Sequence, residues 1–210
     1  MAGPEDSESP KRRAIVDAAT ELFAARGYGA VSMDAIARAA DVSKATLYAH
    51  FTSKDGLFAT IVQVACRESI IPEDELPDRE APDVSAALRA IGGRMLRFFL
   101  RDRSLAIHRL VIAESVRFPE LGRAFYDNGP AACRDMLAAW MVRTRELSVP
   151  NPHVAAEQFI GLLRTGLFLR ATLGLAADPD EASIDAAVTA AVGTFMRAYG
   201  ASREAVPPRS

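Results

Sequence analysis

Cysteine and histidine are scarce in this chain of 210 residues, which has two cysteines and three histidines. Two cysteines are too few for the disulfide scaffold of a small secreted domain, and reduced thiols are the simpler expectation. The histidines (His50, His108 and His153) and the cysteines do not have the spacing of metal ligands. The sequence also has no glycine-rich phosphate loop and no nucleophile motif. We therefore expect no metal, no cofactor and no enzymatic activity.

Long apolar runs are missing as well. No stretch approaches the roughly 18 apolar residues that a membrane-spanning helix needs. The first residues are acidic and polar, whereas a signal peptide would be basic and then apolar. Half of the side chains are nevertheless hydrophobic, which is too many for a disordered chain. These features predict a soluble cytoplasmic protein without a membrane partner.

The formal net charge of −2 is distributed unevenly along the chain. Residues 1–10 carry −3 and residues 67–83 carry −5, whereas residues 11–66 carry +2 and residues 84–210 carry +4. The acidic stretch contains Pro72, Pro77 and Pro82, so it cannot form one continuous helix. The sequence therefore predicts five segments, which are a flexible acidic tail (1–10), a first domain (11–66), a helix end and connector (67–83), a larger domain (84–201) and a flexible C-terminal tail (202–210).

Within the two domains the apolar residues recur at helical spacing. Between residues 15 and 23 they fall at i, i+3, i+4, i+7 and i+8, so one stripe of a first helix is apolar. Pro119, Pro130 and Pro152 stand where later helices can begin. No alternating run is long enough to indicate a strand. The pattern predicts an all-α fold of about nine helices.

Residues 32–54 carry the most informative pattern. Ser32 can cap one short helix, and Ser43 can cap a second one that buries Leu47 and Phe51. Two short helices around a three-residue turn, preceded by a longer helix, are typical of a helix-turn-helix, whose second helix enters the DNA major groove. The alternative is a helical hairpin that only packs, because short capped helices are common in all-α proteins.

The outward side of the second helix would then contact DNA. Lysine and threonine can reach base edges, whereas tyrosine and histidine can donate hydrogen bonds to phosphates. Lys54, at the start of the next helix, offers an ammonium group and backbone N–H groups to a phosphate. Each such residue alone is more often an ordinary surface residue. The outward residues are Lys44, Ala45, Thr46, Tyr48 and His50.

Three blocks of the first domain follow a specific pattern at fixed spacing. Residues 18–28 read AATELFAARGY, residues 42–51 read VSKATLYAHF and residues 53–58 read SKDGLF. In these blocks the chain resembles the DNA-binding domain of the TetR/AcrR transcriptional regulators. The resemblance implies double-stranded DNA as a partner, with phosphates held by Ser32, Tyr48, His50 and Lys54 and base edges approached by Lys44, Ala45 and Thr46.

Two residues depart from the family pattern, because Asp41 and Ala45 stand where glycine is usual. Aspartate tolerates the left-handed conformation better than most residues, so we expect the turn to survive. Ala45 leaves a methyl group towards the groove and affects only the base preference. The basic residues 11–13 either touch the DNA backbone or belong to a solvated tail.

The larger domain resembles the regulatory part of the same family more loosely, nearest the subgroup with a segment like PELGRAFYDNGP at residues 119–130. Segments 153–174 and 184–199 are apolar or small on more than one face, so they must be buried on two sides. One side can face the protein's own domain and the other implies a homodimer with a four-helix interface, which the resemblance also implies. The alternative is an internal core without dimerisation. The expected interface residues are Leu162, Gly166, Leu169, Val188, Ala191, Val192, Phe195 and Tyr199.

Large, adaptable apolar side chains of this domain are candidates for lining an effector pocket. They favour a small hydrophobic or amphipathic molecule, with His108 and Arg164 as polar groups that orient it. Methionine and aromatic residues at helical spacing are more often core residues, so packing alone remains the alternative at each position. The candidate lining residues are Met95, Phe98, Phe99, His108, Met136, Trp140, Phe159, Leu163 and Phe168.

These features predict a one-component transcriptional regulator. It would bind a palindromic operator as a homodimer, most simply as a repressor, and be released when a small molecule changes the spacing of the two recognition helices. Two alternatives remain, which are a helical enzyme acting on small hydrophobic substrates and a carrier of such molecules that does not bind DNA. Sequence-specific, salt-sensitive DNA binding separates the regulator from both.

Overall fold

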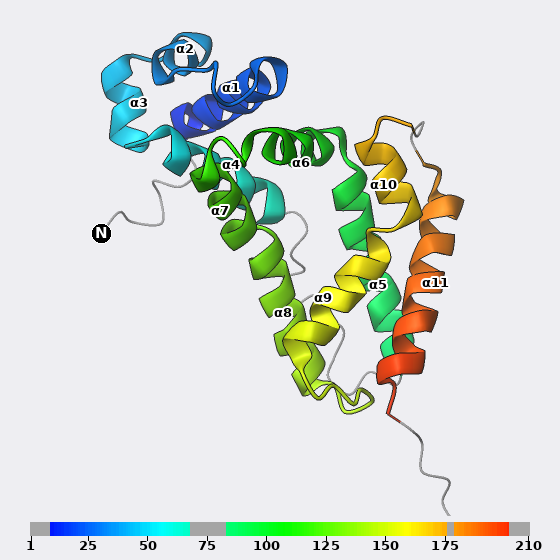
Figure 1. Cartoon of the computed structure of the whole chain (residues 1–210). Helices are drawn as coiled ribbons and strands as arrows, with labels where there is room; N and C mark the ends of the chain where they lie inside the picture. The colour runs from blue at the N-terminus through cyan, green and yellow to red at the C-terminus, as the bar shows by residue number, and fades with distance from the viewer. Residues whose placement is uncertain (1–8, 68–82, 176–178, 202–210) are drawn as a thin grey trace, which may run out of the picture. The chain divides into compact units, whose positions relative to one another are not determined.

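The structure is a computed structural model that describes residues 9–67, 83–175 and 179–201 (Figure 1). Residues 1–8 of the predicted acidic tail, residues 68–82 of the connector and the C-terminal tail lie outside these residues, and the first helix begins at Pro10, within the segment predicted as tail. The described part is all-helical, as predicted, and its only β feature is an isolated bridge between Leu147 and Gly200. It contains eleven helices, where the sequence pattern indicated about nine. They are α1 (Pro10–Arg26), α2 (Met33–Ala39), α3 (Lys44–His50), α4 (Lys54–Arg67), α5 (Val84–Leu100), α6 (Asp102–Glu114), α7 (Pro119–Asn128), α8 (Pro130–Arg143), α9 (Pro152–Leu163), α10 (Gly166–Thr172) and α11 (Glu181–Tyr199).

The chain forms two compact units. The first combines Met1–Ser69 with Arg101–Ala132, and the second combines Ile70–Leu100 with Cys133–Ser210. Helices α6 and α7, which the sequence pattern placed in the larger domain, therefore belong with α1 to α4. The second unit holds α5, most of α8, and α9 to α11.

Local signals set the helix starts of the first unit. The side chains of Ser9, Ser32 and Ser43 each accept a hydrogen bond from the backbone N–H three residues later, which is the usual action of an N-cap serine. Gly27 ends α1 with a φ of +77°, a conformation that side chains disfavour. These caps explain why the helices begin and end close to the predicted positions.

An aromatic cluster joins the helices of the first unit behind the helix-turn-helix. The ring of Tyr28 lies 5.2 Å from that of Phe23, 5.8 Å from that of Phe58 and 5.4 Å from that of Phe118, measured between centroids. Tilted and edge-on contacts at such distances are the favoured geometry of aromatic pairs. The cluster therefore ties α1 and α4 to the start of α7.

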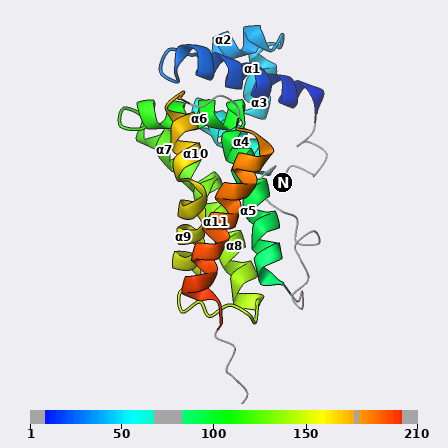
Figure 2. The same ribbon diagram turned by 90° about the vertical axis from the view of Figure 1, so that its right-hand side faces the viewer.

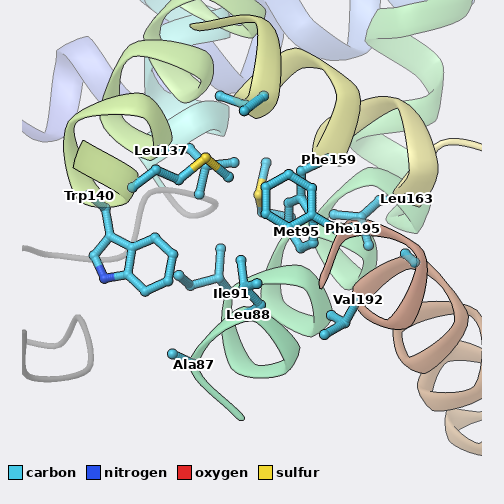
Figure 3. Close-up of a cluster of buried hydrophobic side chains, with 14 of the residues drawn as sticks. Ala87, Leu88, Ile91, Met95, Leu137, Trp140, Phe159, Leu163, Val192 and Phe195 are labelled. Carbon is cyan, nitrogen blue, oxygen red and sulfur yellow. The ribbon is translucent and has the colours of Figure 1, made fainter. Parts of the chain in front are cut away.

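The core of the second unit lies where α5, α9 and α11 pack side by side (Figures 1 and 2). Gly92 of α5 permits their close approach, because a Cβ atom there would lie 3.2–3.3 Å from side chains of Leu163, Phe159 and Val188. Figure 3 shows the rings of Phe159 and Phe195 beside Met95 in this cluster, with the two ring centroids 5.2 Å apart. Full burial of such side chains contributes about 1.5–3 kcal/mol each.

The apolar segment 153–174 forms two helices. Helix α9 ends at Leu163, and α10 begins at Gly166. The Thr165 hydroxyl donates a 3.0 Å hydrogen bond to the Leu162 carbonyl and so competes with the regular helix pattern. None of the described helices is long and apolar enough to cross a membrane.

Candidate functional site

The turn between α2 and α3 has the conformation that the sequence predicts. Asp41 adopts a φ of 52°, in the left-handed region, so aspartate replaces the usual glycine there without loss of the turn. The Val42 N–H donates to the Ala37 carbonyl at 3.0 Å and holds the two helices together. The structure thus contains the helix-turn-helix predicted from residues 32–54.

Helix α3 has one buried side and one exposed side. Leu47 and Phe51 are buried in the unit, with exposed fractions of 0% and 4%. Ala45 and Tyr48 are exposed, and half of the Tyr48 surface is accessible. The ring of His50, which is half-buried, lies 6.5 Å from that of Phe51. The structure therefore separates the buried Leu47 and Phe51 from the exposed Lys44, Ala45 and Tyr48. The other two predicted outward residues, Thr46 and His50, are half-buried.

The serines and Thr46 are held by local hydrogen bonds. The Ser32 side chain accepts from the Ala35 N–H at 3.2 Å, and the Ser43 side chain accepts from the Thr46 N–H at 3.0 Å. The hydroxyl groups of Ser43 and Thr46 also lie 2.8 Å apart. These bonds orient the Thr46 hydroxyl at the start of α3 before any DNA is present.

Lys44 forms an ion pair across the turn that the sequence pattern did not predict. Its Nζ lies 2.5 Å from Oδ2 of Asp34, in the first turn of α2. The two side chains are 66% and 41% exposed. No local spacing rule pairs residues ten positions apart on different helices, so only the packing of α2 on α3 reveals this contact.

The Lys54 side chain points into the first unit. Its ammonium group donates to the carbonyls of Tyr28 at 2.9 Å and Val31 at 3.1 Å and lies 4.2 Å from the centre of the Tyr28 ring. Burial lowers the pKa of this ammonium group, and the Asp55 carboxylate opposes that effect. Lys54 therefore holds the loop before α2, and its contact with a DNA phosphate stays a prediction.

Tyr28 completes this arrangement behind the helix-turn-helix. Its hydroxyl donates a short hydrogen bond to the Asp55 carboxylate. Burial, together with this bond, raises the pKa of Tyr28 above its usual value. The glycine–tyrosine pair at residues 27–28 thus stops α1 and supplies a buried anchor for α4.

Most of the predicted pocket residues lie in the core of the second unit. Met95, Trp140, Phe159 and Leu163 belong to one buried cluster, in which Figure 3 labels all four, and Phe99 and Met136 pack against it. Phe98 and Phe168 are also largely buried. His108 is apart from them, because it lies in the first unit with its ring 5.9 Å from that of Phe125.

Arg164 is the one strongly polar group among these candidates. Its guanidinium carbon lies 5.2 Å from the centre of the Phe99 ring and 4.5 Å from that of Phe168. Burial lowers the pKa of Arg164, and the neighbouring Cys133 opposes that effect. A cation held between two aromatic faces at the edge of an apolar core is suited to contact the polar part of an amphipathic molecule.

Helix α11 presents to solvent a different face from the one expected. Val188, Ala191, Val192 and Phe195 are buried in the protomer's own core, with at most 4% of their surface exposed. Their surface is therefore almost entirely taken up by the protomer's own core, and of these four residues only Phe195 also lines the groove described next. The opposite side of α11 is exposed and carries small residues, namely Ala186, Ala190, Thr194 and Ala198.

A groove between α9 and α11 includes Thr194 and Ala198 of this exposed side. Within it the Tyr199 hydroxyl donates to Oε1 of Gln158 at 2.6 Å. Of the other expected interface residues, Leu162 lines the groove, whereas Gly166 and Leu169 lie exposed on α10. The groove is lined by Gln158, Gly161, Leu162, Thr165, Thr194, Phe195, Ala198 and Tyr199.

The capped helices, the turn and the exposed side of α3 define a helix-turn-helix protein with a second helical unit. Two family models match the chain: one described as bacterial regulatory proteins of the tetR family matches residues 15–61, and one described as the C-terminal domain of AefR-like transcriptional repressors matches residues 86–201. The chain belongs to the TetR family of transcriptional regulators.

Individual relatives agree with this assignment. The HTH-type transcriptional regulator UidR of Escherichia coli K12 is 25% identical over 204 residues, which are 94% of this chain and 99% of UidR. YhgD, an uncharacterized HTH-type regulator of Bacillus subtilis, is 36% identical over 84 residues, so the match spans 39% of this chain and only 44% of YhgD. The solved structure of the flavonoid-responsive regulator FrrA is 38% identical, with a TM-score of 0.76, over 93% of this chain and 98% of FrrA.

Proposed function

We propose that the protein is a homodimeric one-component repressor, which binds a palindromic operator and is released by a small hydrophobic or amphipathic molecule. The observation that carries this proposal is the amphipathic surface of α3, which buries Leu47 and exposes Ala45 and Tyr48, with the buried Phe51 directly after the helix. A short helix held in this way can enter the major groove without loss of its own core. As a regulator of bacterial genes it would act in the cytoplasm, with no catalytic step of its own.

The side chains of α3 divide into two proposed roles. Lys44, Ala45 and Thr46 stand in its first turn and approach base edges, as recognition helices do with their N-terminal residues. Tyr48 and His50 donate to phosphates, as do the first turns that Ser32 and Ser43 cap. The phosphate contacts set the register of the helix on DNA, and the base contacts select the sequence.

The exposed sides of α9 and α11 support the proposed homodimer. Small residues allow helix backbones to approach closely, and Gly161, Thr194 and Ala198 line the groove between these helices. Two copies of these helices would form a four-helix interface around a two-fold axis. Because a seven-residue recognition helix contacts few base pairs, a second copy about one DNA turn away doubles the site that is read.

Aromatic and cationic side chains at the edge of the second unit's core support an aromatic effector. Phe99 and Phe168 offer stacking surfaces, and Arg164 between them offers a cation for a phenol or an acid group. FrrA, the structural relative described above, is flavonoid-responsive, which makes flavonoids the first compounds to test. If the effector bound the DNA-released conformation more tightly than the DNA-bound one by about 3 kcal/mol, operator binding would weaken roughly 100-fold.

A gel-shift titration tests the regulator proposal. The probe is the DNA that flanks the protein's own gene, compared with a random duplex of the same length at increasing salt concentration. We expect retardation that is stronger for the flanking DNA and weakens steeply with salt. Equal retardation of both probes, or none, would reject the proposal.

A thermal-shift screen of flavonoids and simpler phenols tests the effector. We expect at least one compound to raise the unfolding temperature and also to release the retarded DNA. A compound that stabilises the protein but leaves the DNA bound would be a ligand without the proposed regulatory role.

A further inference from the structure

The ion pair between Lys44 and Asp34 lies on the surface that the proposed function assigns to DNA. Lys44 is the first residue of α3, and Asp34 lies in the first turn of α2. Their charged atoms are 2.5 Å apart, and both side chains keep much of their surface exposed. The only cation in the first turn of the recognition helix is thus held by a carboxylate of the neighbouring helix.

An exposed ion pair of this kind is easily exchanged, because it adds little to stability. It nevertheless changes what Lys44 can contribute to DNA binding. A lysine that neutralises a phosphate releases counterions, and this release drives binding to DNA of any sequence. A lysine already neutralised by a carboxylate loses a contact when it turns to a phosphate, so its contribution to random DNA is small.

The operator can offer Lys44 a replacement for the Asp34 carboxylate that random DNA does not offer. A guanine in the correct register offers two acceptors, O6 and N7, to one lysine. Those acceptors replace the carboxylate at a fixed place in the major groove, whereas a random sequence offers them only by chance. The cost of leaving Asp34 is therefore offset at the operator and is not offset elsewhere.

We propose that Asp34 is a specificity-determining residue, which holds Lys44 on the protein and so suppresses binding to non-operator DNA. This inference rests on the proposed function, since it assumes that α3 enters the groove. Asp34 acts through Lys44 and is a positioning residue without a required DNA contact of its own.

The test compares the salt dependence of DNA binding in matched variants of the full chain. Asp34→Asn removes the ion pair and keeps the side-chain size. Asp41→Asn is the control, because it makes the same change of charge at an exposed residue of the adjacent turn, where asparagine also tolerates the left-handed conformation. The probes are a random duplex and an operator fragment that the unmodified protein selects from a random library.

For Asp34→Asn we expect binding to the random duplex to strengthen about five-fold at 0.1 M salt. The slope of log K against log salt should become steeper by about 0.9 for each recognition helix, because one more lysine neutralises a phosphate. Operator binding should strengthen less, so the ratio of operator to random affinity falls. Asp41→Asn should change the slope by much less.

A double-mutant cycle with Lys44→Gln separates the proposed role from simple repulsion between Asp34 and DNA. In the Lys44→Gln background, Asp34→Asn should have almost no further effect, because the lysine it releases is gone. An equal gain in both backgrounds, or an unchanged slope in Asp34→Asn, would overturn the role of Asp34 while the regulator proposal stands. If the unmodified protein selects no operator, both proposals fail.

Discussion

At the scale of single residues, Lys54 shows how a side chain with the right chemistry for DNA can serve the fold. Its ammonium group satisfies two carbonyls of the loop that leads into α2. Those carbonyls come from Tyr28 and Val31, which are both buried. The position of α2, and therefore of α3, depends on this internal bond.

Replacement of Lys54 tests that role. We expect Lys54→Met to lower the free energy of unfolding by about 1–3 kcal/mol, because the partly buried carbonyls of Tyr28 and Val31 each lose the hydrogen bond from the ammonium group. Thermal or urea denaturation followed by circular dichroism measures the loss. Unchanged stability together with a weaker salt dependence of DNA binding would instead assign the ammonium group to a phosphate.

For Tyr48 we expect a role in DNA binding and none in stability, because half of its surface is exposed. Tyr48→Phe should leave stability within about 0.5 kcal/mol and weaken binding to operator and random duplexes by similar factors, since a phosphate contact carries no sequence information. Fluorescence anisotropy with both duplexes measures this. Tyr126→Phe is the matched control, because Tyr126 of α7 in the same unit is also 50% exposed. A loss confined to the operator would assign Tyr48 to a base.

At the scale of helices, the first domain was predictable and the second was less so. In the first domain, Ser32, Ser43 and Gly27 act within three or four residues of their own positions, and such local signals can be recognised in a sequence. The break between α9 and α10 has a weaker signal, because Thr165 stands at the N-cap position of α10 without a side-chain capping hydrogen bond. Only the local conformation at Arg164 and Thr165 shows where α9 ends.

Substitution of Gly92 tests how closely α5 packs against α9 and α11. Gly92→Ala should destabilise the protein by about 1–3 kcal/mol, because the added methyl group would crowd three side chains of those helices. Gly93→Ala in the same helix is the control, since a Cβ there meets mainly the flexible end of Arg97. The control should be neutral or stabilising by up to about 1 kcal/mol, the usual difference between alanine and glycine in a helix. Urea denaturation distinguishes the two, and equal effects would contradict this packing.

At the scale of the whole molecule, the exposed face of α11 limits where the proposed homodimer can have its interface. Substitution at Val188 or Phe195 would damage the protomer's own core and would not test an interface. Ala198 is exposed and lines the groove between α9 and α11, so a charged residue there changes the proposed interface and leaves the protomer's core unchanged.

We therefore expect Ala198→Arg to give a monomer while its helix content and unfolding temperature stay close to those of the unmodified protein. Multi-angle light scattering measures the mass. Ala139→Arg, at an exposed position of α8, is the control and should remain dimeric. A dimer in both variants would place the interface elsewhere.

The amino-acid sequence was sufficient for the all-helical class, the caps of the helix-turn-helix and the left-handed turn at Asp41, because each depends on neighbouring residues or on an apolar period. It was not sufficient for the direction in which α11 faces. That helix is apolar or small on nearly every side, so its pattern allows more than one burial, and packing against α5 and α9 selects Val188 and Phe195 for the core. The same holds for the bond from Lys54 to Tyr28 and the ion pair of Lys44 with Asp34, since residues 26 and ten positions apart meet only when whole helices pack together.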